Sequence, residues 1–357
     1  MSTPTWLPEA QTRQPTNEFL PVANGLLHLP TGELHPASPL YFGFGASDVA
    51  FNANAPEPRE WLKFLRSTFG DDNASIELLQ DILGYALSRD ASQQKIMLLV
   101  GPPRSGKGTI ARILTALVGR ENVVAPTMAS LSQNFGLAPL INKSVATIGD
   151  ARISGRTDQA ALAERLLSIS GEDTQTIDRK FKEAWTGRLP IRFFILTNEL
   201  PRLTDSSGAI ANRFVVLVMK RSFLGAEDRE LEARLRREHS GIMNWALEGY
   251  RRLRARGRFV QPECALEAIQ EVEELASPIK VFIAEKCKLD GQVPIGDLYA
   301  AWVRWCALNG HEPGSRGLFG RNLKTTVPAL KQSQTRDTDG NRLRVYMGIS
   351  LKPGWEP

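Results

Sequence analysis

The sequence predicts an α/β protein with a mostly parallel sheet at its core. Three short apolar runs, at 95–100, 144–149 and 191–197, have the length and composition of strands buried on both faces. Helical stretches separate these runs, and strands that alternate with helices favour a parallel arrangement. A glycine-rich turn follows the first run directly and leads into a helical stretch, so the chain is expected to fold around a strand–loop–helix unit.

The segments before this core predict a small N-terminal region. Residues 1–23 are rich in proline and are expected to form a flexible arm. Short apolar stretches at 24–36 are broken in the middle by a Pro-Thr-Gly turn signal, which indicates a hairpin. The apolar spacing then becomes helical at 61–69 and again at 76–87. We therefore expect residues 24–92 to combine a hairpin with a small helical bundle, and the core to occupy 93–224.

The segments after the core change character twice. Residues 225–261 are helical and strongly basic, with nine arginines between Arg229 and Arg258. Beyond them, the patterns are helical at 265–288, 294–308 and 315–326, and strand-like at 329–335 and 342–351. Helices followed by a β-hairpin predict a winged-helix-like domain at 262–357, with its wing around the turn signal at 337–340.

Composition and charge exclude several classes of protein. The 357 residues are 42% hydrophobic and 23% charged, which is typical of a globular protein. The three dispersed cysteines and four histidines show no metal-ligand spacing, so neither a disulfide framework nor a structural zinc site is expected. No signal core and no apolar run of membrane-spanning length is visible, so a cytoplasmic location is expected. The net charge of +5 permits a nucleic-acid partner without requiring one.

The strongest functional signal is a phosphate-binding loop between the first strand and its helix. Backbone N–H groups and the helix N-terminus favour an anion there, and the loop lysine is expected to reach the β- and γ-phosphates of a nucleotide. The usual Ser or Thr directly after the lysine is replaced by glycine, which leaves open which hydroxyl meets Mg²⁺; Thr109 is the candidate. The loop residues are Gly101, Pro102, Pro103, Arg104, Ser105, Gly106, Lys107, Gly108 and Thr109.

Three further polar residues are candidates for nucleotide hydrolysis. Asp150 follows the second apolar run, where a carboxylate can hold Mg²⁺ or its water shell; the alternative is a helix cap or turn residue. Asn198 ends the third run and could orient an attacking water, or form an Asx turn before Pro201. Arg213 precedes the apolar run 215–219 and could be an arginine finger or a surface ion-pair partner.

The order of Lys107, Asp150, Asn198 and Arg213 resembles that of superfamily 3 helicases, a branch of the AAA+ ATPases. The likeness covers residues from about 24 to 351 and is most specific in the core, at 170–203. It is similar there to poxvirus-type and phage or plasmid primase-helicases. The resemblance implies a ring, usually a hexamer, that hydrolyses ATP with Mg²⁺ at subunit interfaces and moves along single-stranded DNA. It also makes the region 24–92 an oligomerisation collar.

Carried onto this chain, the resemblance implies four catalytic roles. Lys107 belongs to the ATP loop, Asp150 is the metal carboxylate beside Thr109, Asn198 is the sensor, and Arg213 reaches the ATP of a neighbouring subunit. It also implies a basic hairpin in the channel of the ring. The residues expected there are Arg179, Lys180, Lys182 and Arg188, with Phe181 and Trp185 interleaved.

Aromatic residues among the cations of this hairpin would suit base stacking along a tracked phosphate backbone. The alternative is a solvated hairpin with Phe181 in the core. In the tail, the third helical pattern carries Arg316, Arg321 and Lys324, which are expected to contact duplex phosphates.

The expected function is that of an ATP-dependent DNA helicase in the replication of a phage, prophage or mobile element, in a bacterial cytoplasm. The first alternative is an initiator or loader that ATP assembles at an origin without processive unwinding. The second is a small-molecule kinase, suggested only by the Gly-Lys-Gly-Thr ending of the loop. Residues 1–60 contain too few acids for a primase, so the expected partners are single-stranded and forked DNA, further copies of the chain, and a separate primase or polymerase.

Overall fold

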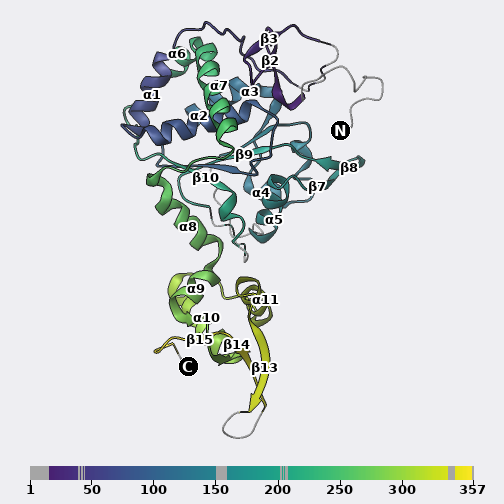
Figure 1. Cartoon of the computed structure of the whole chain (residues 1–357), viewed down its shortest axis with the longest axis vertical. Helices are drawn as coiled ribbons and strands as arrows, with labels where there is room; N and C mark the ends of the chain where they lie inside the picture. Colours follow the sequence, from purple (N-terminus) through teal and green to yellow (C-terminus); the bar gives the residue numbers. More distant parts are fainter. Residues whose placement is uncertain are drawn as a thin grey trace. The chain divides into compact units, whose positions relative to one another are not determined.

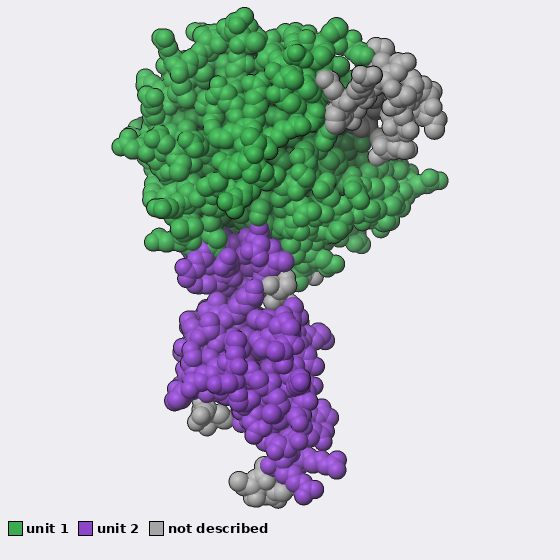
Figure 2. Space-filling model, viewed as in Figure 1, with its two compact units in different colours: residues 1–201, 213–269 green, residues 202–212, 270–357 purple. Residues whose placement is uncertain are grey.

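Two compact units make up the chain (Figure 2). Unit 1 contains residues 1–201 and 213–269, and unit 2 contains residues 202–212 and 270–357. The computed structural model describes residues 16–355 except 39, 40, 42, 44, 150–158, 202, 204, 206, 207 and 337–341. The N-terminal region, the basic helical segment and all of the core except residues 202–212, which the sequence pattern divides at 92 and 224, therefore lie in one unit.

A five-stranded parallel sheet forms the centre of unit 1 (Figure 1). Its order is β10-β4-β9-β6-β5, and every neighbouring pair is parallel. The expectation of an α/β fold with a parallel sheet is confirmed, because the apolar runs form buried strands. The strands are β4 (Ile96–Val100), β5 (Val123–Val124), β6 (Val145–Gly149), β9 (Arg192–Thr197) and β10 (Phe214–Val218).

Helices from both ends of unit 1 share one core with this sheet. The helices expected at 61–69 and 76–87 are present as α1 (Arg59–Phe69) and α2 (Asn73–Leu87), and the basic segment forms α6 (Leu231–Arg237) and α7 (His239–Arg256). The remaining helices of this unit are α3 (Lys107–Val118), α4 (Met128–Ser132) and α5 (Gln159–Ser170). None of the helices in the described part of the chain is both long and apolar enough to cross a bilayer.

Helices α2 and α7 pack backbone to backbone through two glycines. A Cβ atom on Gly84 would lie 2.3 Å from the amide nitrogen of Tyr250, and one on Gly249 would lie 2.1 Å from the carbonyl oxygen of Gln80. Next to this contact, the buried carboxylate of Asp81 accepts a hydrogen bond of 2.9 Å from Nε of Arg252. Helix α7, which follows the sheet in sequence, is thereby fixed against the helix that precedes the core strand β4.

An antiparallel three-stranded sheet begins the described chain. It consists of β1 (Phe19–Val22), β2 (Gly25–His28) and β3 (Glu33–His35), in that order, after a 3-10 turn at Thr16–Glu18. The hairpin expected at 24–36 is confirmed as β2 and β3. The expected end of the flexible arm at residue 23 is wrong, because Leu20 and Val22 of β1 are buried in the core. Residues 1–15 lie outside the described part of the chain.

Unit 2 contains a helical cluster and a small antiparallel sheet. In its core, the Trp302 ring stacks on the rings of Trp305 and Phe319, and Phe282 meets both tryptophans edge to face. The helix expected over 265–288 is wrong. It is two helices, α8 (Leu266–Ala276), which crosses the division between the units, and α9 (Pro278–Lys286), because Pro278 lacks the N–H that would continue the first. The other helices are α10 (Ile295–Asn309) and α11 (Arg316–Thr326).

The strands of unit 2 form two small sheets. The sheet β12-β14-β13 carries the expected hairpin as β13 and β14. The two-residue strands β11 and β15 pair with each other in a separate antiparallel sheet. The single strand expected over 342–351 is broken at Gly348, whose φ of 90° lies in the left-handed region. The strands are β11 (Cys287–Lys288), β12 (Gln292–Pro294), β13 (Lys331–Arg336), β14 (Arg342–Met347) and β15 (Ser350–Leu351).

Candidate functional site

The loop between β4 and α3 depends on glycine at both of its ends. A Cβ atom on Gly101 would lie 2.4 Å from the carbonyl oxygen of Met219, directly after β10. Gly106 has a φ of 98°, and a Cβ atom there would lie 2.9 Å from the ring of Phe64. Lys107 then begins α3, so the loop turns tightly from the end of a buried strand into a helix N-terminus. This is the geometry that the sequence motif predicts.

The ammonium group of Lys107 lies inside this loop. It donates to the carbonyl oxygens of Gly101 at 2.6 Å and Pro102 at 2.9 Å, and to Oγ of Ser105 at 3.1 Å. A fourth oxygen, Oδ1 of Asn198, lies 3.0 Å away. Burial lowers the pKa of Lys107. All four of these oxygens are neutral, so a phosphate oxygen would be a stronger partner for this charge.

Asn198 meets Lys107 because their strands are neighbours. It follows the last residue of β9, and β9 pairs with β4 in parallel, so both strands end at the same edge of the sheet. The next strand on the other side, β6, also ends there, with Gly149 opposite Leu196. Asp150, the residue after β6 and the expected metal carboxylate, lies outside the described residues. The structure therefore brings together Lys107 and Asn198 of the four expected catalytic residues.

Arg213 lies where the parallel strands begin, and the phosphate-binding loop lies where they end. It precedes Phe214, which pairs with Ile96 at the start of β4, whereas Val218 pairs with Val100 beside the loop. Five strand residues, roughly 16 Å at 3.3 Å each, therefore separate Arg213 from the level of the phosphate-binding loop. Its Nη1 donates to Oε1 of Gln94 at 2.5 Å and to the carbonyl oxygen of Gln94 at 3.3 Å.

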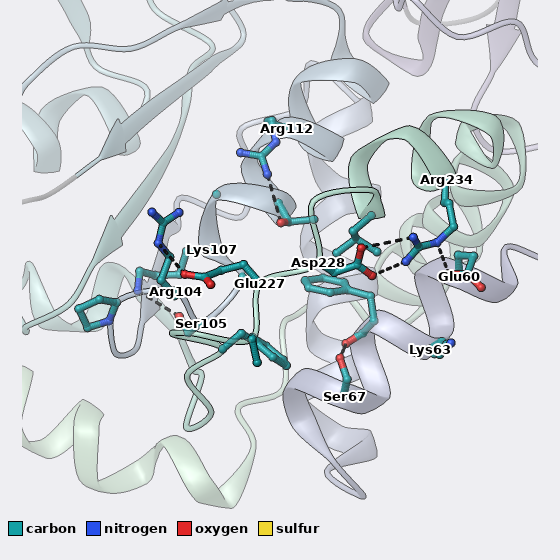
Figure 3. A pocket seen from close by; sticks show the side chains of 18 of the residues that line it. Glu60, Lys63, Ser67, Arg104, Ser105, Lys107, Arg112, Glu227, Asp228 and Arg234 are labelled. Carbon is teal, nitrogen blue, oxygen red and sulfur yellow. Dashed lines mark hydrogen bonds and ion pairs between the residues drawn. The ribbon is translucent and has the colours of Figure 1, made fainter.

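A cavity of about 670 Å³ opens beside the loop, within unit 1 (Figure 3). Ligand pockets of roughly this volume hold small organic molecules, including nucleotides. Lys107, Thr109 and Asn198 line one end. Phe64 and Phe223 lie against the loop: the Phe64 ring is next to Gly106, and the backbone N–H of Phe223 donates to the carbonyl oxygen of Arg104 at 3.0 Å. The other lining residues come from the loop, α1, α3, α6 and the segment before α6.

Several charged residues around the cavity form ion pairs. Arg104 of the loop lies 3.6 Å from Glu227, and Arg112 of α3 lies 3.0 Å from Glu232. The hydroxyl of Thr109 accepts from Arg112 at 3.3 Å. Across the residues that the structure describes, no group of three or more His, Cys, Asp or Glu side chains is arranged to hold a metal ion.

Sequence reasoning missed much of the cavity lining. Phe64 lies in a helix that was expected only as part of a bundle, and Phe223 follows the last strand of the sheet without any motif. The run of arginines in 225–261 was a signal, but it did not single out Arg234, which lines the cavity. The additional lining residues with charged side chains are Glu60, Lys63, Arg112, Glu227, Asp228 and Arg234.

The basic hairpin expected near 179–188 is present as β7 (Thr174–Arg179) and β8 (Lys182–Arg188). Phe181 at its tip is 94% exposed, so the alternative that buries this ring in the core is wrong. Nζ of Lys180 lies 5.2 Å from the centre of that ring. Lys182 and Arg188 are exposed, and Arg179 is half-buried with its Nε donating to the carbonyl oxygen of Glu183 at 2.9 Å.

Exposed cations also cover one helix of unit 2. Arg316, Arg321 and Lys324 all lie on α11 and are exposed, while Phe319 and Leu323 of the same helix are buried. Arg342 and Arg344 of β14 are exposed as well. The three cations expected to contact a duplex therefore lie on one amphipathic helix, next in sequence to a hairpin.

A family model and a curated protein each match a part of this chain. The family model that matches residues 99–213 is described as a family of unknown function (DUF5906). Among curated proteins, a "Ribonuclease 3" from Geobacter sulfurreducens is 32% identical over 128 residues, which cover 36% of this chain and 46% of that protein. This chain therefore spans about half the length of that relative.

Solved structures of the NrS-1 C-terminal region match far more of the chain. An apo structure of its residues 305–718 has a TM-score of 0.55 and 16% identity, and the match covers 87% of this chain and 80% of that one. An A-form apo structure has a TM-score of 0.51 and 17% identity, covering 84% and 78%. The chain shares the fold of that region. The likeness extends beyond the phosphate-binding loop to most of the described molecule.

Proposed function

We propose that the chain is an ATP-hydrolysing DNA helicase of the superfamily 3 type, acting as a ring in the replication of a phage, prophage or mobile element. One observation carries the proposal. Lys107 of the phosphate-binding loop lies 3.0 Å from Asn198 on the neighbouring strand, at the mouth of a cavity large enough for a nucleotide. A phosphate loop beside a polar strand-end residue is the arrangement that nucleotide hydrolysis requires.

The residues of the cavity fit ATP and Mg²⁺. The ammonium of Lys107, now on neutral oxygens, would move to the β- and γ-phosphates, and the N–H groups at the start of α3 would bind the same oxygens. Thr109 and Asp150 would hold Mg²⁺, which neutralises charge that develops on the transferred phosphate. The amide of Asn198 would orient the attacking water.

The strand order supports an AAA+ arrangement of these parts. The loop strand β4 lies between β9, which ends at Asn198, and β10, which begins after Arg213. Arg213 is at the far edge of the sheet from the loop of its own subunit. On this proposal it completes the site of a neighbouring subunit, where an arginine finger can contribute about 10³–10⁵ in rate.

Two surfaces are proposed to contact DNA. The hairpin tip, with Phe181 exposed between Lys180 and Lys182, would face the single strand in the channel of the ring. In unit 2, α11 followed by the β13–β14 hairpin supports a winged helix whose cations contact duplex phosphates. The exposed cations of α11 equally favour a second candidate function, an origin-binding initiator or loader that ATP assembles.

Hydrolysis and strand displacement on a forked duplex, measured with the full chain, test the proposal. We expect the wild type to hydrolyse ATP and release an intact labelled strand, and Lys107→Ala to do neither while keeping the fold. Lys143→Ala, which changes a lysine that binds the carbonyl oxygen of Glu121, serves as the control and should resemble the wild type. ATPase activity without displacement would favour the initiator or loader. Equal turnover by Lys107→Ala would overturn the nucleotide site, and a shortened labelled strand would indicate a nuclease.

A further inference from the structure

The cavity beside the phosphate-binding loop has a second end with different chemistry. Opposite Lys107, it is lined by Glu60 and Lys63 of α1, by Asp228, and by Arg234 of α6 (Figure 3). The guanidinium group of Arg234 bridges the two carboxylates. Its Nε donates to Oε2 of Glu60 at 2.8 Å, its Nη1 lies 3.3 Å from Oδ1 of Asp228, and its Nη2 pairs with the other oxygen of Asp228.

Hydrogen bonds to backbone N–H groups fix the segments that carry Glu60 and Asp228. The carboxylate of Glu238 accepts from the backbone N–H groups of Glu60 and Trp61, at 3.0 Å each, and so fixes the start of α1. Asp228 accepts from the backbone N–H of Glu230 at 3.1 Å, just before α6 begins. Hydrogen bonds from Arg234 lower the pKa of Asp228, so this side chain is ionised at neutral pH.

The carboxylates select what can lie against them. An ionised carboxylate has about four acceptor sites and no donor. Arg234 and the backbone N–H groups of Glu230 and Leu231 occupy most of those of Asp228, whereas Glu60 accepts from Nε of Arg234 at one oxygen and keeps the greater spare capacity. A triphosphate has acceptors but no donor for these carboxylates, so Lys107 and the N–H groups at the start of α3 are its better partners. The uncharged half of a nucleotide, by contrast, has hydroxyl and amino donors. A nucleotide with its phosphates at Lys107 would place these donors further along the same cavity.

We propose that Glu60 and Asp228, bridged by Arg234, select the nucleoside half of the bound nucleotide by accepting hydrogen bonds from its ribose hydroxyl or base amino donors. The inference rests on the proposed nucleotide site and adds to it the residues that determine which nucleoside is accepted. Lys63 at the same end is exposed and would remain in solvent.

Calorimetric titration of the full chain with three nucleotides tests this proposal. The ligands are ADP, 2′-deoxy-ADP, which lacks one ribose hydroxyl, and purine riboside diphosphate, which lacks the base amino group. The buffer contains EDTA, so that no carboxylate–metal contact contributes. We expect the wild type to bind at least one analogue about tenfold more weakly than ADP, the lower range for a hydrogen bond to a charged group. The analogue that loses affinity identifies the ribose or the base as the source of the donor.

Variants then locate the effect. Glu60→Gln and Asp228→Asn keep the size of each side chain but replace one acceptor oxygen with a donor, so at least one should reduce the tenfold preference to about twofold or less. Glu232→Gln is the matched control. Glu232 lies on α6, like Arg234, but its carboxylate pairs with Arg112 at 3.0 Å, so this variant should keep the preference. Equal binding of all three ligands by the wild type, or an undiminished preference in both variants, would overturn this inference alone. A wild type that binds none of the ligands would overturn the nucleotide site as well.

Discussion

Lys107 is held in the phosphate-binding loop by oxygens that carry no formal charge. Its four partners are two loop carbonyls, one hydroxyl and the amide oxygen of Asn198. Each of these contacts is with a neutral oxygen, so an anionic ligand that reaches the ammonium group would be a stronger partner. Burial disfavours the charged form of an amine, and this is why the pKa of Lys107 is lowered.

The lowered pKa predicts how nucleotide affinity depends on pH. Below this pKa the ammonium is charged and affinity should be constant. Above it affinity should fall, and the fall should begin below the ordinary lysine value of 10.5. ADP titrations between pH 7 and 10, with circular dichroism as a check on folding, measure this. Lys107→Arg stays charged throughout and should show no fall. A wild-type profile that stays flat, or a matching fall in Lys107→Arg, would contradict the prediction.

Sequence reasoning could find the phosphate-binding loop and Asn198 but not the residues that complete the lining of the cavity. Lys107 and Asn198 each follow a recognisable apolar strand, and parallel strands end at one edge, so their meeting was predictable. Phe64, Phe223 and Arg234 come from segments more than 150 residues apart in places, and none has a local motif. Their convergence is produced by tertiary packing of α1 and α6, which no local pattern encodes.

The contact between α2 and α7 depends on the absence of side chains at two positions. Gly249→Ala would put a Cβ atom 2.1 Å from a backbone oxygen of α2, and backbone cannot move aside as a flexible side chain can. We expect a loss of about 1–3 kcal/mol in the free energy of unfolding, the usual cost of overpacking. Urea denaturation followed by circular dichroism measures it.

Gly317→Ala is the control for this substitution. Gly317 lies inside α11, and its Cβ would have only the Ser315 hydroxyl near it, at 4.0 Å. Replacing an exposed helical glycine with alanine stabilises a helix by up to about 1 kcal/mol. If Gly249→Ala were as stable as the wild type, the close packing of α2 and α7 would be wrong.

The β7–β8 hairpin allows stacking and charge to be separated. Phe181→Ala should weaken single-stranded DNA binding by about 1–3 kcal/mol without changing its salt dependence, because a neutral ring is removed. Lys180→Ala with Lys182→Ala should instead reduce the slope of log affinity against log salt by roughly 0.7 per lost phosphate contact. Fluorescence anisotropy at several salt concentrations measures both.

The hairpin variants should leave thermal stability unchanged, because the Phe181 ring is 94% exposed. Leu34→Ala, which truncates another exposed apolar side chain of unit 1, is the control and should bind DNA as the wild type does. Wild-type affinity and salt slope in all of the hairpin variants would remove this hairpin from the DNA-binding surface.

Strand and helix periodicity predicted most elements of the chain, and the errors have physical causes. The sequence pattern places β1 in the flexible arm because Pro21 lies within it, yet an edge strand tolerates proline. β5 has only two residues, too few to show a period. The helix expected over 265–288 shows one continuous apolar spacing across α8 and α9, and only Pro278 marks the break.

Two parts of the proposed site, Arg213 and Lys107, lie at opposite ends of the parallel strands of one sheet. Arg213 precedes β10, and Lys107 follows β4, which runs parallel to it. If Arg213 acts as the proposed arginine finger, it therefore acts on the site of a neighbouring subunit and not on its own. We expect Arg213→Ala to bind ADP with wild-type affinity but to hydrolyse ATP about 10³-fold more slowly or worse.

Mixing the two inactive variants tests whether Arg213 acts across an interface. Lys107→Ala has an intact arginine and Arg213→Ala has an intact loop, so mixed assemblies should recover part of the wild-type turnover. Each variant mixed with itself is the control and should stay inactive. Mixed assemblies without recovery at any ratio, together with a specific activity of the wild type that is independent of dilution, would show that Arg213 does not act across an interface.

The position of Arg213 also limits the symmetry of any active assembly. A two-fold dimer joins identical patches, whereas here the loop edge of one subunit would have to meet the Arg213 edge of the next. In an open, arc-shaped assembly with such head-to-tail contacts, the first subunit and the last subunit each have one surface without a partner. An arc therefore contains one fewer complete site than it has subunits, and the last site forms only when the arc closes on itself. Turnover per subunit would then report ring closure directly, and a ring opened to admit a DNA strand would lose the site at its gap.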